Sequence, residues 1–223
     1  MFNLLREIYQ SPAGSWLGFK GGTLMYFFYN LDRFSVDLDF DLLDPVHKDL
    51  VRQTVRQVAG RFGRLRDDSD KRYTVFFLLD YEAGGRNVKI EISKRFDPNN
   101  TYEIKNFYGT DIKTIKIEDA FVHKLLAATT RNRIANRDFF DVYFFLKHGF
   151  KFNPKIIEAA TGKKTREYMF FLMDFIKKNR AGASMLDGLG ELVRPEQKIW
   201  IKNNLKKELL AQLQFFLDSN FMA

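Results

Sequence analysis

Residues 35–42, SVDLDFDL, alternate polar or acidic side chains with apolar ones at every position. A period of two predicts a β-strand with one face in the core and the other outside it. The apolar side chains of this strand would be buried. The carboxylates of Asp37 and Asp39, two positions apart, would point together to the outer face. The stretch therefore predicts a strand that serves the core and an acidic site at once.

The paired carboxylates predict a metal site on this strand. Side chains as close as Asp37 and Asp39 repel one another unless a cation lies between them. Hard oxygen ligands on a short baseline suit Mg²⁺, whose octahedron substrate phosphates can complete. The alternative is an exposed strand with a solvated acidic face, and Asp41, which extends that face, favours this alternative.

A glycine pair precedes this strand in the chain. Trp16–Lys20 reads as a short strand that runs into Gly21 and Gly22, and Thr23 would cap a helix that follows it. Paired glycines at the start of a helix let the backbone approach a phosphate closely. The helix N-terminus supplies free N–H groups and the positive end of a dipole. An ordinary tight turn is the alternative.

The rest of the chain predicts an α+β fold. A hairpin is expected from Tyr73–Tyr81 and Asn87–Ser93, with its turn around Gly84-Gly85, and Asp111–Ile117 reads as an edge segment. Helical spacing or capping signals predict the helices Met1–Ile8, Leu24–Asn30, Lys48–Phe62, Asp119–Thr130, Arg137–Lys147, Pro154–Ala160, Thr165–Asn179 and Pro195–Phe216. The expected organisation is a small mixed sheet with flanking helices in residues 1–117, followed by a helical domain in residues 118–223.

Glu91 is the third acidic candidate. In the strand Asn87–Ser93 its side chain shares a face with Lys89, and the apolar residues take the other face. Glu91 would act as a base toward an attacking hydroxyl or as a shared metal ligand. A surface strand face of Lys and Glu is the alternative.

Composition limits the partners and the kinds of site. The net charge is +8, which favours polyanions such as nucleic acid or phosphorylated molecules. From Lys151 onward thirteen Lys and Arg against eight Asp and Glu give +5, so the helical half is either an RNA-binding wall or a solvated helix surface. The absence of Cys excludes disulfides and thiolate metal sites. No signal-like or bilayer-length apolar run is present, so we expect a cytoplasmic protein without a membrane partner.

Four motifs in this order resemble the DNA polymerase β-like nucleotidyltransferase superfamily. They are Gly21-Gly22-Thr23, then RFSVDLDF at residues 33–40, then KIEI at residues 89–92, and a later basic and acidic motif. The form R-x-S-x-D-L-D-F resembles the AbiEii/AbiGii branch, which includes the MenT toxins. In that branch the later motif corresponds here to Lys124, Arg131, Arg133, Arg137-Asp138 and Asp141. The resemblance spans about Phe19–Leu146.

The resemblance implies an activity and a set of roles. Members transfer a nucleotide from a nucleoside triphosphate with Mg²⁺, or Mn²⁺ as an alternative, and MenT-type members modify tRNA ends. AbiEii-type members are toxins paired with a separate antitoxin protein in a type IV system. By the same resemblance, Asp37 and Asp39 match the metal ligands and catalytic aspartates. The nucleotide- and phosphate-binding positions match Gly21, Gly22, Thr23, Arg33, Ser35 and Lys124.

Lys124 and Asp138 match the later catalytic Lys and Asp of the branch. On one continuous helix their spacing would return them to about the same face. A Lys ammonium suits triphosphate oxygens, Asp138 would orient it or contact base or ribose, and Arg137 would pair with Asp141 on the helix surface. A structural ion-pair cluster is the alternative. Nucleotidylation of a protein or small molecule, or a non-catalytic nucleotide- or RNA-binding member, remains the alternative function.

Overall fold

The computed structural model describes residues 1–81, 87–131, 135–178 and 185–221, and the chain divides into two compact units. The first unit comprises Met1–Asn30 and Phe34–Lys116. The second comprises Leu31–Arg33 and Ile117–Ala223. The short segment Leu31–Arg33 is therefore part of the second unit although it lies between two stretches of the first.

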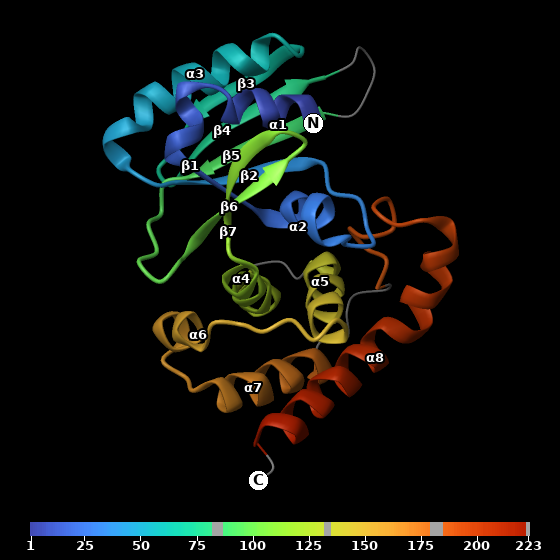
Figure 1. Ribbon diagram of the computed structural model, residues 1–223. Helices are drawn as coiled ribbons and strands as arrows, with labels where there is room; N and C mark the ends of the chain where they lie inside the picture. Colours follow the sequence, from blue (N-terminus) through green and yellow to red (C-terminus); the bar gives the residue numbers. More distant parts are fainter. Residues whose placement is uncertain (82–86, 132–134, 179–184, 222–223) are drawn as a thin grey trace. The chain divides into compact units, whose positions relative to one another are not determined.

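A mixed sheet forms the centre of the first unit (Figure 1). Its seven strands within the described residues run in the order β3-β4-β5-β2-β1-β7-β6. The pairs β2–β5 and β1–β7 are parallel and the other pairs are antiparallel. The strands are β1 (Leu17–Lys20), β2 (Asp37–Leu42), β3 (Arg64–Asp70), β4 (Thr74–Asp80), β5 (Asn87–Ser93), β6 (Tyr102–Phe107) and β7 (Thr110–Ile115). The predicted mixed sheet with flanking helices is confirmed.

Helices α1 (Phe2–Tyr9) and α3 (Lys48–Gly60) cover one face of this sheet (Figure 1). Leu38 and Phe40 of β2, Phe77 of β4 and Ile90 of β5 have no exposed surface. Burying such a side chain is worth about 1.5–3 kcal/mol, so the alternation read in the sequence decides which face enters the core. Two short 3₁₀ helices, Pro12–Trp16 and Pro45–His47, complete the unit.

The sequence analysis did not predict two strands of the sheet, and it predicted a third at the edge although this strand is interior. β3 carries mostly charged side chains and β6 has one buried residue in its six, so neither shows a clear apolar alternation. Both are the edge strands of the sheet. The segment predicted as an edge is β7, which lies between β1 and β6 and has four buried residues in its six.

The glycine pair opens a helix three residues earlier than a cap at Thr23 requires. Helix α2 is Gly21–Tyr29, so Thr23 lies in its first turn and Lys20 occupies the capping position. The prediction that Thr23 caps a helix from Leu24 was therefore wrong. The antiparallel β4–β5 pairing agrees with the predicted hairpin, whose turn around Gly84-Gly85 lies outside the described residues.

The second unit is helical. Its helices in the described residues are α4 (Ile117–Thr130), α5 (Asn136–Lys147), α6 (Pro154–Thr161), α7 (Thr165–Lys178) and α8 (Pro195–Phe221). α8 packs against α5 and α7 through five buried residues spaced four apart, Ile201, Leu205, Leu209, Leu213 and Leu217. The stretches between the helices predicted at Asp119–Thr130 and Arg137–Lys147, and between those predicted at Thr165–Asn179 and Pro195–Phe216, lie partly outside the described residues.

Polar contacts fix the helices of this unit to one another. The Tyr168 hydroxyl on α7 donates to the Leu125 carbonyl on α4 over 2.8 Å. The Asn153 amide donates to Asp119 at the start of α4 over 2.9 Å. Asp32, in the segment Leu31–Arg33, forms an ion pair with Arg194 at 2.8 Å and accepts a hydrogen bond from Gln197 at 2.6 Å. Among the described helices, none is long and apolar enough to cross a bilayer.

Candidate active site

Asp37 and Asp39 lie on the outer face of β2 in the first unit. Both side chains are half-exposed, while Leu38 and Phe40 between and beyond them are buried. Positions two apart on a strand share a face and lie about 6.6 Å apart along it. Glu91 of β5 is the register partner of Asp39 in the parallel β2–β5 pair. The three acidic side chains predicted for the site therefore share one face of the sheet.

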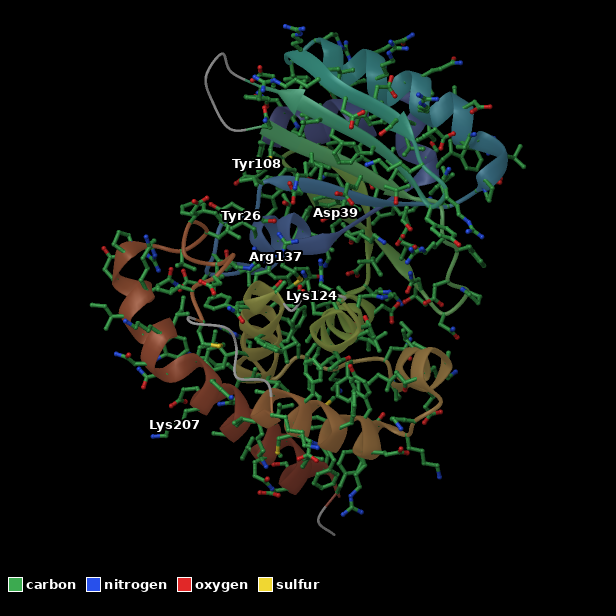
Figure 2. All side chains as sticks on the ribbon, turned by 180° about the vertical axis from the view of Figure 1, so that it is seen from behind. Tyr26, Asp39, Tyr108, Lys124, Arg137 and Lys207 are labelled. Carbon is green, nitrogen blue, oxygen red and sulfur yellow. The ribbon has the colours of Figure 1, made fainter. Side chains whose placement is uncertain are left out.

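The side chain of Asp39, labelled in Figure 2, lies against the backbone of Gly21. Gly21 has φ +82°, in the left-handed region that favours glycine. A Cβ atom at this position would lie 2.1 Å from the Asp39 Oδ2 atom, far inside van der Waals contact. Gly21 is thus required twice, for its backbone angle and for the space that the carboxylate occupies. The glycine turn and the acidic strand form one local structure.

The first turn of α2 supplies backbone donors beside this carboxylate. Lys20 at the capping position makes no side-chain cap hydrogen bond, so its side chain satisfies none of the first N–H groups of the helix. Such groups, at the positive end of the helix dipole, are the ones that bind phosphate. Thr23 is fully buried, and its hydroxyl donates to the backbone carbonyl of Asp37. Its hydroxyl ties α2 to β2 rather than extending toward a ligand.

Asp41 does not extend the exposed acidic face. This differs from the alternative of a solvated acidic face, which its position in the sequence favoured. Only 4% of its surface is exposed. The Lys20 ammonium lies 2.6 Å from one carboxylate oxygen, and the Tyr102 hydroxyl donates to the other over 3.0 Å. Burial and the Asp41 charge raise the pKa of Tyr102, so its hydroxyl stays protonated and remains a donor. Asp41 is a neutralised core residue, and the acidic site is left to Asp37 and Asp39.

The donor set fits a magnesium ion. Among the described residues no group of three or more His, Cys, Asp or Glu is close enough to hold a metal by protein ligands alone. Mg²⁺ is commonly bound by only one or two carboxylates together with waters and substrate phosphates. Asp37 and Asp39 supply that pair, and the Gly21 backbone leaves the Asp39 carboxylate its space. Ser35 is half-exposed two residues before Asp37.

The later motif forms an ion-pair cluster in the second unit. Lys124, labelled in Figure 2, projects from α4, and Asp138 and Asp141 project from α5. The Lys124 ammonium lies 2.8 Å from Asp141 and 3.7 Å from Asp138. α4 and α5 are separate helices that pack together. The predicted proximity of Lys124 and Asp138 therefore arises from helix packing and not from the periodicity of one continuous helix.

Asp141 is the centre of this cluster. It is fully buried and accepts two hydrogen bonds from the Arg33 guanidinium, at 2.6 and 2.7 Å. Burial alone would raise the pKa of Asp141, but the charges and hydrogen bonds of Arg33 and Lys124 outweigh it and lower the pKa to about 2. Asp141 thus pairs with Arg33 and Lys124, and not with Arg137 as the four-residue spacing had suggested.

Arg33 is committed to this pair. Its side chain is 3% exposed, and the two planar groups meet in the bidentate geometry that Arg and carboxylate form best. This geometry argues against the phosphate-binding role that its place in the motif implied. The contact spans 108 residues of sequence, so no local pattern points to it.

Asp138 is buried beside two cations. Arg131 approaches one of its oxygens at 2.7 Å, yet within the described residues neither oxygen accepts an aligned hydrogen bond. The distance between Arg131 and Asp138 is that of an ion pair, but the N–H direction is not that of a hydrogen bond. The contact is therefore one between opposite charges. Arg133, the other basic residue of the motif, lies outside the described residues. Arg33, Lys124 and Arg131 thus face two carboxylates, leaving one positive charge in excess.

Removing the Asp141 charge should destabilise the second unit. Asp141→Asn leaves Arg33 and Lys124 buried without their counter-ion, at a cost of about 3–5 kcal/mol. Because the pKa of Asp141 falls from 3.8 to about 2 on folding, its contribution is complete above pH 4 and disappears as the pH falls toward 2. The difference between wild type and variant should therefore be constant from pH 7 to 5 and shrink below pH 4.

Urea unfolding in a Trp16→Phe background measures this effect, because Trp200 on α8 packs on Tyr143 of α5 and reports the second unit. The control is Glu167→Gln, which breaks the exposed Lys163–Glu167 pair and should cost less than about 1 kcal/mol. Equal unfolding midpoints for the two variants would contradict a stabilising role for the buried cluster.

Comparisons with known proteins agree with this geometry. The crystal structure of JHP933 from Helicobacter pylori matches with a TM-score of 0.67 and 23% identity, covering 97% of this chain and 90% of that one. Another H. pylori structure, provisionally described as a nucleotidyltransferase, matches with a TM-score of 0.63 and 24% identity, covering 97% and 93%. At this identity the likeness shows the fold. A search of curated proteins finds no match.

A family model settles the relationship. The model described as "Nucleotidyl transferase AbiEii toxin, Type IV TA system" matches residues 3–222, nearly the whole chain. The chain belongs to the AbiEii nucleotidyl transferase toxin family and is a nucleotidyltransferase.

Proposed function

We propose that this nucleotidyltransferase moves a nucleotide from a nucleoside triphosphate to RNA, with tRNA as the preferred acceptor, and that the reaction depends on Mg²⁺ held by Asp37 and Asp39. The family supports nucleotidyl transfer within a toxin–antitoxin system. The contact of Asp39 with Gly21 is the observation that carries the site. The net charge of +8 favours a polyanionic acceptor.

In the proposed reaction an acceptor hydroxyl oxygen attacks the α-phosphorus. The bond from that phosphorus to the bridging oxygen breaks, and pyrophosphate leaves with the bonding electrons. Bound Mg²⁺, or Mn²⁺ in its place, neutralises the phosphate oxygens as charge develops. The first-turn N–H groups of Gly21 and Gly22 would bind phosphate, and Asp37 and Asp39 would hold the metal ion. Glu91 accepts the proton of the attacking hydroxyl.

Lys124 is the residue of 118–223 that we propose to bind phosphate. Its ammonium would bind triphosphate oxygens as a point charge. Asp138 and Asp141 act as positioning residues that hold the ammonium, and Arg33 acts through Asp141. Thr23 contributes through its backbone, since its hydroxyl is bound to the Asp37 carbonyl.

Other functions fit the same fold. Transfer of the nucleotide to a protein or a small molecule uses the same metal and phosphate groups, and a degenerate member would bind nucleotide or RNA without turnover. The accessible Asp37 and Asp39 favour catalysis over the degenerate form. The family's toxin–antitoxin assignment implies an antitoxin protein as a partner. We propose that the protein acts in the cytoplasm, where nucleoside triphosphates and tRNA occur.

Substitution of the metal ligands tests the function. Asp37→Asn and Asp39→Asn should each lower transfer on the order of a thousandfold, because the metal supplies several kcal/mol of transition-state stabilisation. Labelled triphosphates are incubated with total tRNA, protein and Mg²⁺ or EDTA, beside an Asp111→Asn control at an exposed surface position. Label on protein alone would favour the alternative acceptor. Metal-independent transfer, or none to any acceptor, would refute the proposal.

Gly21→Ala tests the close approach of the glycine turn to Asp39. The added methyl group must displace the carboxylate, and a misplacement of about 1 Å costs roughly a hundredfold in rate. Gly109→Ala is the matched control, because Gly109 has the same φ of +82° but no neighbouring atom within 4 Å. Both variants pay the same backbone strain, so only the first should lose transfer. Equal losses in kcat would mean that the contact with Asp39 has no catalytic role.

Glu91→Gln separates a base from a surface residue. If Glu91 accepts the proton, transfer should fall about 10²–10⁴-fold, since Gln cannot take up a proton. Lys89→Gln is the control, because Lys89 is exposed and lies on the same face of β5. The kcat for nucleotide transfer is measured for both. A Glu91→Gln variant within about twofold of wild type would assign Glu91 to the surface.

A further inference from the structure

An exposed aromatic ring in contact with two guanidinium groups lies just before β4 in the first unit. Tyr73 is 44% exposed, and its ring centroid lies 4.9 Å from the Arg72 Cζ atom and 4.6 Å from the Arg95 Cζ atom. Nearby, the Lys71 ammonium lies 4.1 Å from the ring centroid of Phe76. These five residues, Lys71, Arg72, Tyr73, Phe76 and Arg95, are called the β4 patch below.

The cations of the β4 patch have no acidic partners. In the described part of the chain, Lys71, Arg72 and Arg95 form no ion pair. The neighbouring carboxylate of Asp70 is already bound by Lys48 at 3.0 Å and Lys94 at 2.5 Å. Two like charges on one ring repel each other, and a cation–π contact at an exposed site returns only about 0.5–1 kcal/mol. An anion that bridges the two guanidinium groups would relieve the repulsion.

Phe76 of the β4 patch shares a sheet face with the acidic site. Ladder pairing places Ser69, Phe76, Glu91 and Asp39 side by side on four neighbouring strands. Neighbouring strands are about 4.8 Å apart, so Phe76 lies about 10 Å across the sheet from Asp39. Phe76 and Glu91 are half-exposed, so this face is open to a ligand. A chain bound at Tyr73 and Phe76 would thus lead toward the carboxylates proposed for catalysis.

We propose that the β4 patch binds the single-stranded end of the RNA acceptor. Bases stack on the rings of Tyr73 and Phe76, and Arg72, Arg95 and Lys71 contact the phosphates. The inference rests on the proposed transfer to RNA and adds the surface that holds the acceptor. Exposed rings interleaved with cations favour nucleic acid over an acidic peptide, which has no base to stack. They favour a single strand over a duplex, whose bases are stacked internally.

Binding measurements without nucleotide or metal test the patch independently of catalysis. The probe is a fluorescent RNA hairpin with a four-nucleotide 3′ overhang, compared with the same hairpin ending blunt. Tyr73→Ala should weaken binding of the overhang RNA about tenfold, and Tyr73→Phe should restore it, because the ring and not the hydroxyl stacks. Arg72→Ala/Arg95→Ala should make the slope of log K against log[salt] shallower by about 1.4, because two phosphate contacts on a single strand are lost.

Arg166→Ala/Phe170→Ala is the matched control, since it removes another exposed arginine and ring in contact, on α7. It should bind the overhang RNA as wild type does. Equal weakening by the control and the patch variants, equal loss for blunt and overhang hairpins, or displacement of the RNA by polyglutamate as readily as by single-stranded RNA would each overturn the proposal.

The same measurements distinguish this inference from the proposed function. Overhang-specific binding that depends on Tyr73, in a protein that transfers nucleotide only to protein, supports the patch and refutes RNA as acceptor. Normal transfer to tRNA with Tyr73→Ala unchanged in Kd and KM refutes the patch and leaves the proposed function standing.

Discussion

The close approach of the Asp39 carboxylate to the Gly21 backbone is the constraint on which the acidic site depends. It requires that residue 21 have no side chain and that the chain turn through a left-handed φ between β1 and α2. The Thr23 hydroxyl, bound to the Asp37 carbonyl, fixes the first turn of α2 to the same strand. Backbone donors of a helix and two carboxylates are thereby held together by local geometry alone. Few other arrangements would place a phosphate within reach of both the helix N–H groups and the two carboxylates.

Neutralisation of one aspartate defines the site as much as exposure of the other two. Asp37, Asp39 and Asp41 lie at successive outward positions of one strand and are chemically identical in the sequence. Lys20, opposite Asp39 in the β1–β2 ladder, reaches Asp41 instead, and Tyr102 completes the coordination of that carboxylate. A stripe of three repelling charges is thus divided into a buried, compensated residue and an accessible pair.

The sequence predicted well what depends on local periodicity. The alternation in β2 and β5 predicted their inward faces, and helical spacing predicted the helices of the second unit to within a few residues at most ends. β3 and β6 were missed because edge strands bury little and so carry no apolar alternation. The partners of Asp41 and Asp141 could not be predicted, because Tyr102 and Arg33 lie 61 and 108 residues away in the chain. Resemblance to a family marked Arg33 and Asp141 without revealing that they pair.

The distribution of ion pairs decides which of the positive charges can bind a polyanion. A net charge of +8 means that cations are in excess, but it does not show where on the protein they lie. Arg33 and Lys124 are bound by Asp141, and Lys48 and Lys94 by Asp70. Each of these cations is partly compensated by a carboxylate at close range. Arg72 and Arg95 have only a tyrosine ring between them, which compensates a full charge weakly. A phosphate backbone gains most where cations lack partners, so the β4 patch attracts RNA more strongly than a count of basic residues along the helical half would suggest.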